Sequence, residues 1–160
     1  NHLYQETPAL WEEDFSWEGF QWIVPDDSSQ NVVVFLRRGK KGGEVIAVCN
    51  FAPVLRPDYK FGVPRAGQYA ELINSDAEEF GGTGQHNAPV RAKKQPMHGF
   101  DYSISLRVPP MSAVILRTPA AKPAKADGPA PKKAAARGAR AKPARKTAAR
   151  KTTGKQAKDA

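Results

Sequence analysis

The stretch NVVVFLRRGKKGGEVIAVCNF, residues 31–51, decides the fold. Two runs rich in Val, Ile and Phe flank the turn signal KKGG. β-Branched and aromatic residues favour strands, and a glycine-rich break between two such runs is typical of a β-hairpin. Because both runs are almost continuously apolar, we expect two buried strands joined by a tight turn.

Four further segments downstream carry strand signals: 55–67, 68–76, 102–110 and 111–119. In YSISLRVPP every second residue from Ile104 to Val108 is apolar, and the residues between are Ser or Arg. We therefore expect one buried and one solvated face for this strand. A long Gly- and Pro-containing loop, residues 78–99, separates it from the preceding segments. Six or seven short strands with no helix between them predict an all-β antiparallel sandwich.

The first 13 residues predict one short helix before Pro8 and another turn after it. The aromatic stretch FSWEGFQWIVPDD follows at residues 15–27. The chain begins without Met on a helical pattern, so we expect a C-terminal fragment of a longer protein. The expected organisation is 1–24 as the end of a preceding domain with an aromatic crossover, 25–118 as the sandwich, and 119–160 as a tail.

The basic charge lies in that tail. Residues 119–160 contain 13 Lys and Arg against 2 Asp and Glu, whereas residues 1–118 contain 12 against 14. The tail has no large apolar residue, so it cannot offset the entropy of ordering and is expected to be disordered. Its cations could bind a polyanion, and the absence of aromatic residues predicts binding that is indifferent to nucleic-acid sequence. The candidate contacts are Lys132, Lys133, Arg137, Arg140, Arg145, Lys146, Arg150 and Lys151.

The sequence contains no recognisable catalytic or metal-binding motif. The single Cys and the three widely separated His residues do not match a metal-ligand spacing, so we expect neither a metal nor another cofactor. The adjacent acid pairs fit solvated surface positions better than facing glycosidase carboxylates. No residue is therefore predicted to be catalytic. Among the many aromatic residues, Trp17 and Trp22 are the candidates for a sugar-stacking platform, although packing in the core or between domains is the favoured explanation for most of these residues.

The order of several segments resembles the C-terminal region of bacterial 1,4-α-glucan branching enzymes. The segments that carry the resemblance are PALWEEDF, GFQWI, FLRR, NFAPVLRPDYKFGVPRAGQYAELINSD and HGFDYSISLRVPPMSAVIL. It covers residues 1–118. The loop between Phe80 and Gly99 lacks the Asn-Gly-Gly step of many relatives, and the basic tail is not a feature of that family.

This resemblance implies a helix that closes a (β/α)8 catalytic barrel, followed by an all-β C-terminal domain of the α-amylase type. It also implies a cytoplasmic parent enzyme of glycogen biosynthesis that transfers an α-1,4-glucan chain to a 6-hydroxyl. The expected partners are α-glucans such as glycogen and amylose, and the missing barrel; no membrane is expected. The fragment itself would be non-catalytic, because a barrel needs about 250 residues. A stand-alone carbohydrate-binding module and a polyanion binder remain the alternatives.

Overall fold

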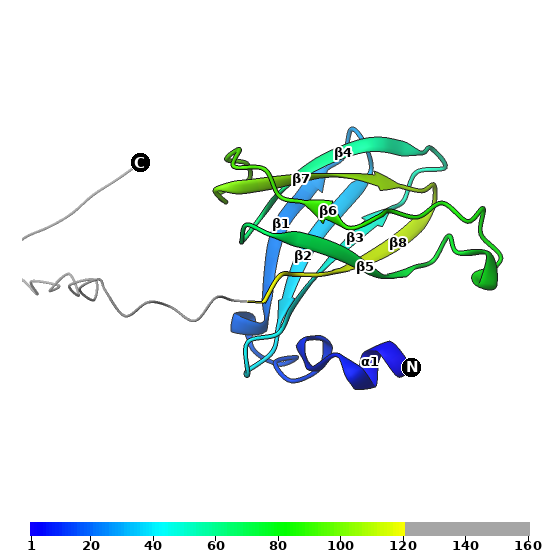
Figure 1. The fold of residues 1–160 in the computed structure, drawn as a ribbon. Helices are drawn as coiled ribbons and strands as arrows, with labels where there is room; N and C mark the ends of the chain where they lie inside the picture. Colours follow the sequence, from blue (N-terminus) through cyan, green and yellow to red (C-terminus); the bar gives the residue numbers. More distant parts are fainter. Residues whose placement is uncertain (121–160) are drawn as a thin grey trace, which may run out of the picture. The chain divides into compact units, whose positions relative to one another are not determined.

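Two antiparallel sheets make up the part of the chain that the computed structural model describes, residues 1–120 (Figure 1). The large sheet has the strand order β1-β2-β3-β8-β5-β6, and the small sheet pairs β4 with β7. This arrangement confirms the expected all-β antiparallel fold. The strands are β1 (Phe20–Asp27), β2 (Val32–Arg38), β3 (Glu44–Asn50), β4 (Arg56–Val63), β5 (Gln68–Asn74), β6 (Val90–Arg91), β7 (Tyr102–Val108) and β8 (Ser112–Arg117).

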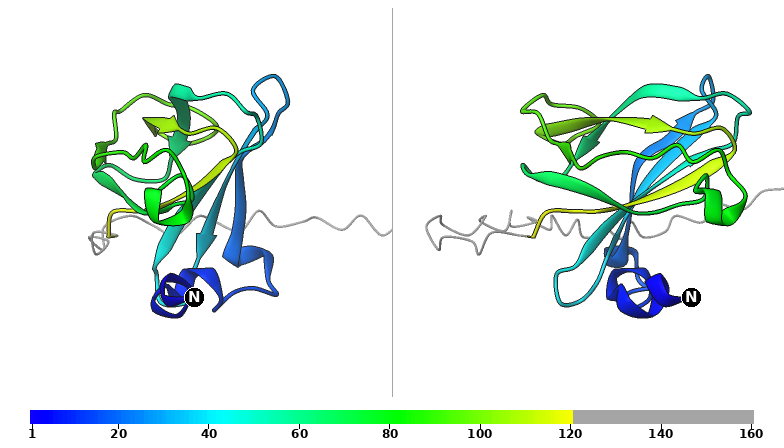
Figure 2. Two further views of the ribbon diagram at one scale, coloured as in Figure 1. Left: turned by 90° about the vertical axis from the view of Figure 1, so that its right-hand side faces the viewer. Right: turned by 45° about the vertical axis from the view of Figure 1, so that its right-hand side comes forward.

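The predicted hairpin is confirmed as β2 and β3. Its register pairs Val34 with Val48 and Leu36 with Ile46, and the Gly39 amide donates to the Gly43 carbonyl at 2.8 Å to close the turn. Figure 2 shows this hairpin extending past the small sheet toward the N-terminal segment. The last described strand, β8, pairs with β3 on one side and β5 on the other, so this strand lies in the interior of the large sheet.

The core lies between the two sheets. Strand β4 contributes Tyr59 and Phe61, and β7 contributes alternate residues from Ile104 to Val108, all at most 5 % exposed. They pack on the inward residues of the large sheet, which are completely or almost completely buried. A period of two along each strand places these residues on one face. The inward set is Val34, Leu36, Ile46, Val48, Val114 and Leu116.

The expected solvated face of β7 is only partly solvated. Ser103 is 4 % exposed, which corrects the prediction that it faces water. The reason is the preceding loop, which runs beside β7: Lys93 and Ser103 exchange backbone hydrogen bonds of 2.9 and 3.0 Å. Asn87 adds a hydrogen bond of 2.9 Å to the Arg107 carbonyl. Periodicity therefore identified the apolar face of this strand but could not show what covers the other.

The same loop is anchored on β4 at Gly62. A Cβ atom there would lie 2.0 Å from the carbonyl oxygen of Met97, so only glycine permits this approach. The Gly62 amide donates a 3.2 Å hydrogen bond to Nδ1 of His98, whose φ of 50° lies in the left-handed region. The long loop is thus fixed at its far end by one backbone contact and one side chain.

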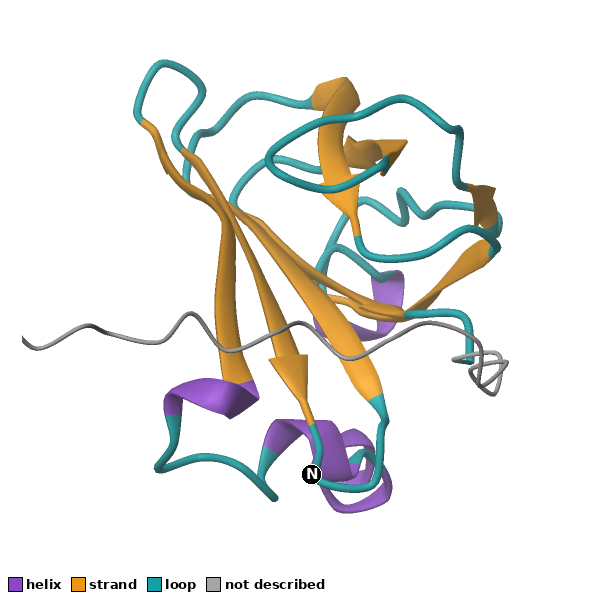
Figure 3. Ribbon diagram, turned by 90° about the vertical axis from the view of Figure 1, so that its left-hand side faces the viewer, coloured by secondary structure: helices purple, strands orange, loops and turns teal. Residues whose placement is uncertain are grey.

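The N-terminal segment contains the predicted short helix, α1 (His2–Glu6), and a 3₁₀ turn at Pro8–Leu10. It packs against the end of the large sheet, as the helical and strand parts in Figure 3 show. Ala9 is 2 % exposed, and Arg37 on β2 donates hydrogen bonds to the Leu10 carbonyl at 3.3 Å and to Asp14 at 2.7 Å. A second 3₁₀ turn, Trp17–Gly19, leads directly into β1.

Candidate functional site

Trp22 stands on β1, the edge strand of the large sheet, and its side chain turns away from the core. Its ring meets the Phe20 ring edge-on with centroids 5.0 Å apart, and the Phe35 ring at 6.0 Å. Phe20 and Phe35 stack on each other at 5.4 Å. Trp22 remains 51 % exposed. Two aromatic neighbours therefore hold the indole in place while much of its surface stays open to a ligand.

Trp22 also begins an apolar row that crosses the outer face of the large sheet. Strand register places Trp22 opposite Phe35, Phe35 opposite Ala47, Ala47 opposite Ile115, and Ile115 opposite Ile73. We call these five residues the outer row. At the end of the row opposite Trp22 lies an apolar hollow, lined by Ile73, Ser75, Phe80, Ala113 and Ile115. Sequence reasoning missed this row, because each of its members comes from a different strand.

Trp17 lies in a different setting from Trp22. It belongs to the 3₁₀ turn before β1, is 86 % exposed, and lines a small hollow of about 280 Å³. The structure does not place the two predicted tryptophans against each other. Phe20 connects them, because its ring packs on Trp22 and also lines the hollow of Trp17. The remaining lining residues of the hollow are Glu18, Gln21 and Arg38.

Polar side chains support this hollow from the side of β2 and β3. Arg38 donates through Nη2 to Oε1 of Gln21, and through Nε to Oε1 of Glu44 at 3.0 Å. The other carboxylate oxygen of Glu44 forms an ion pair of 2.5 Å with Arg65. The backbone of Arg65 is in turn held by Tyr69, whose hydroxyl donates to the Arg65 carbonyl at 2.9 Å. Burial raises the pKa of Tyr69 to about 12, so its hydroxyl stays protonated as a donor.

A second polar group joins the two sheets at the opposite end of β1. The buried Tyr59 donates a 2.9 Å hydrogen bond to Asp27, which also accepts hydrogen bonds from Ser29 and Gln30. Burial alone would raise the pKa of Asp27, but these hydrogen bonds outweigh it and hold the pKa below the usual value. Burial and the neighbouring carboxylate raise the pKa of Tyr59. Every acceptor position of Asp27 thus serves the fold, which favours a structural role.

The remaining sequence predictions concern a metal site, a membrane and the basic tail. Residues 1–120 contain no group of three or more His, Cys, Asp or Glu side chains that could hold a metal ion. Within the same part of the chain, no helix is long and apolar enough to cross a membrane. The eight cationic candidates of the tail, Lys132 to Lys151, lie outside the described residues. The prediction of their role in polyanion binding is therefore untested.

Residues 22–119 match the family described as alpha amylase, C-terminal all-beta domain. The match covers most of the chain and coincides with the two sheets, so the chain belongs to this family.

Several 1,4-alpha-glucan branching enzymes are similar to this chain. The chain is 47 % identical over 117 residues to the 1,4-alpha-glucan branching enzyme GlgB of Aromatoleum aromaticum, a match over 72 % of this chain and 18 % of the relative. The corresponding enzymes of Aquifex aeolicus and Halothermothrix orenii are 45 % and 41 % identical over 119 residues, each match covering 73 % of this chain and 19 % of the relative. The chain is thus homologous to the C-terminal region of branching enzymes and spans under a fifth of their length.

A solved structure of an alpha-amylase from H. orenii is also similar, with a TM-score of 0.44 and 16 % sequence identity. The similarity covers 74 % of this chain and 18 % of the amylase.

Proposed function

We propose that this chain is the C-terminal β domain of a cytoplasmic 1,4-α-glucan branching enzyme in glycogen biosynthesis. In that enzyme, residues 1–24 would be the end of the catalytic barrel and the aromatic crossover, whose last residues enter β1 of the large sheet. Residues 25–118 would form the β domain, and residues 119–160 a basic appendage. The barrel would carry the transfer of an α-1,4-glucan chain to a 6-hydroxyl. This domain would position the glucan and stabilise the enzyme. The names and the identity of the relatives support the proposal.

The proposed role in glucan positioning rests on Trp22, whose ring is held by aromatic neighbours and is half exposed. A pyranose ring stacks on an aromatic face, and an indole that is already immobilised loses little entropy when it binds. Phe20 and Phe35 hold Trp22, and the side chain remains half exposed. An exposed Trp without a ligand or partner leaves a large apolar surface in water, so its placement favours a contact.

Affinity electrophoresis of the full chain in glycogen-containing gels tests this contact. We expect glycogen to retard the chain and Trp22→Ala to remove most of the retardation. The matched control is Phe80→Ala, because Phe80 is 55 % exposed, similar to Trp22, and lies in another part of the domain. Equal retardation of the wild type and of Trp22→Ala would exclude the Trp22 platform. A branching assay by iodine absorbance on the chain alone should show no activity, and branching by the chain alone would contradict the proposal that the barrel carries the transfer.

We propose that the part of the outer row beyond Phe35, namely Ala47, Ile115 and Ile73, contacts the catalytic barrel that the family resemblance implies before this chain, while Trp22 at the other end of the row stays accessible to glucan. The N-terminal segment already packs on the neighbouring row of the same face, next to Arg37 and Val45. The outer row continues this surface, and apolar residues on an exposed sheet face mark an interface. In the complete enzyme, Ile115→Glu should therefore lower the melting temperature or activity more than Lys60→Glu, a control at an exposed position of β4 in the small sheet. Equal effects of the two substitutions would contradict the proposal that the barrel docks on this part of the outer row.

A polyanion contact by the tail is the second candidate function, favoured by its charge of 13 cations against 2 acids. The eight cationic candidates between residues 132 and 151 would neutralise phosphates or other anions without sequence preference. Binding of duplex DNA by the full chain, measured at several salt concentrations, should weaken steeply with salt. Replacing these eight residues by Gln should flatten the dependence of the logarithm of affinity on the logarithm of salt. The same slope for both proteins would exclude the tail from binding.

A further inference from the structure

We propose that the hollow lined by Trp17, Gln21 and Arg38 is a hydrogen-bonding subsite for one glucosyl unit. It would be filled by a glucan chain that also contacts Trp22, so this inference rests on the proposed glucan contact at that residue. The ligand class is a neutral, polyhydroxylated sugar, and the evidence comes from the exposure of Trp17, the orientation of Gln21 and the charge balance around Arg38.

Trp17 is exposed on a backbone that is tightly held. The turn packs so closely that a Cβ atom on Gly19 would lie 2.1 Å from the Glu13 carbonyl oxygen. The Ser16 hydroxyl donates to Glu13 at 2.7 Å, and the Gly19 amide donates to the Ser16 carbonyl. The exposure of 86 % therefore belongs to an anchored turn. An exposed indole on an anchored turn, beside a hollow that also holds polar side chains, provides a stacking face for a sugar ring.

Gln21 is oriented by its bond to Arg38. A guanidinium group can only donate, so the Gln21 amide must present its oxygen to Arg38. The amide nitrogen of Gln21, with its two N–H donors, then points away from Arg38. Since Gln21 also lines the hollow, these donors are available to hydroxyl oxygens of a sugar there. The Glu18 carboxylate at the same hollow supplies the complementary acceptor.

The charge balance favours a neutral ligand. Arg38 is paired with Glu44 at 3.0 Å, and Glu44 is shared with Arg65. Glu18 lines the same hollow, so two carboxylates balance the two guanidinium groups. The hollow therefore combines an aromatic face, donors and an acceptor without an uncompensated positive charge to attract phosphate. Vicinal hydroxyl groups, which donate and accept, suit this combination. Arg38 acts here as a positioning residue for Gln21.

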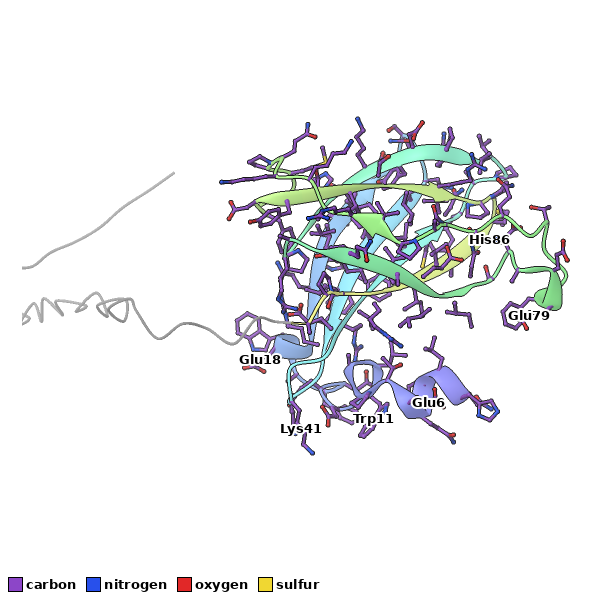
Figure 4. The ribbon with its side chains drawn as sticks, viewed as in Figure 1. Glu6, Trp11, Glu18, Lys41, Glu79 and His86 are labelled. Carbon is purple, nitrogen blue, oxygen red and sulfur yellow. The ribbon has the colours of Figure 1, made fainter. Side chains whose placement is uncertain are left out.

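Continuity with Trp22 completes the argument. Phe20, two residues before Trp22 on the edge strand β1, contacts the Trp22 ring and also lines the hollow, whereas Gln21 between them points to the other face of the strand. A glucan chain lying over Trp22 would therefore reach the hollow by passing over Phe20 at the edge of the sheet. Figure 4 labels Glu18 at this end of the domain and Glu79 at the other, so Phe80, which follows Glu79, is a remote control position.

The test is isothermal titration of the full chain with maltoheptaose. Trp17→Ala should weaken binding about tenfold or more. Gln21→Leu, which keeps the size of the side chain and removes its donors, should weaken binding about threefold to tenfold. Phe80→Ala should leave the Kd unchanged. Arg38→Met, which removes the donor that orients the Gln21 amide, should weaken binding as Gln21→Leu does, with little further loss in the double variant, because both changes remove the same oriented amide.

This experiment distinguishes a structural role of Trp17 and Gln21 from a role in binding. If Gln21→Leu lowers the melting temperature but leaves the Kd for maltoheptaose unchanged, the subsite is wrong. If Trp22→Ala weakens binding while Trp17→Ala and Gln21→Leu do not, the proposed glucan contact stands and the subsite is rejected. If the wild-type chain does not bind maltoheptaose or glycogen, both proposals fail together.

Discussion

The inner and outer faces of the large sheet come from the same strands, yet only the inner face is closed within the domain. On β2, Val34 and Leu36 are fully buried under the small sheet, whereas Phe35 between them turns outward and is half-buried. Trp22, which lies opposite Phe35, is half exposed. Both faces are apolar. The difference shows that alternation assigns a residue to a face, whereas burial depends on which layer covers that face.

The largest expected effect is on the inner face. Leu36→Ala should lower the free energy of unfolding by about 2–5 kcal/mol, because it removes a fully buried side chain and leaves a cavity between the sheets. Val33→Ala, on the same strand but on the outer face, should cost about 1 kcal/mol or less. Urea unfolding of the full chain measures both values. A cost of similar size at the two positions would break the distinction between the faces.

An intermediate effect is expected at the polar bridge between the sheets. Tyr59→Phe removes the hydrogen bond to Asp27 and should cost about 1–2 kcal/mol at pH 7. The pKa of Asp27 is lowered in the folded state, so its contribution is present above the unfolded-state pKa of about 3.9 and is lost as pH falls through the folded-state value. The difference between the wild type and Tyr59→Phe should therefore shrink in acid. Urea midpoints measured between pH 7 and pH 2 check this, and a constant difference would exclude Asp27 as the partner.

The smallest expected effect is on the outer row in the isolated chain. Ile115→Glu should change the free energy of unfolding by less than about 1 kcal/mol, because Ile115 is only partly covered within residues 1–120. Ile115→Glu should lower the stability much more in the complete enzyme, where we propose that the barrel covers Ile115. Thermal unfolding of both proteins gives the comparison. A large loss already in the isolated chain would mean that the outer row belongs to the domain's own core.

Sequence reasoning found the fold but not the arrangement of its surfaces. The hairpin of residues 31–51 followed from β-branched runs around a glycine-rich turn, which are local signals. The candidate Trp22 was identified by its residue type, but its immobilisation depends on Phe35, which pattern reasoning treated only as part of a strand. The support of Gln21 by Arg38 joins residues 17 positions apart. Such pairings have no periodic signature, so they could not be predicted.

The sequence by itself determined the hairpin of β2 and β3, the strands β4, β5, β7 and β8, the apolar face of β7 and the concentration of positive charge after residue 118. These properties follow from side-chain volume, branching and charge, which act over a few neighbouring residues. The strand β1 did not follow from them, because the aromatic density of its residues indicates a crossover. Only the tertiary structure decided that β8 lies between β3 and β5, that Ser103 is covered, and that five strands align the outer row. Each of these depends on contacts between distant segments. Their geometry is set when the two sheets and the long loop pack together, which residue patterns along the chain do not encode.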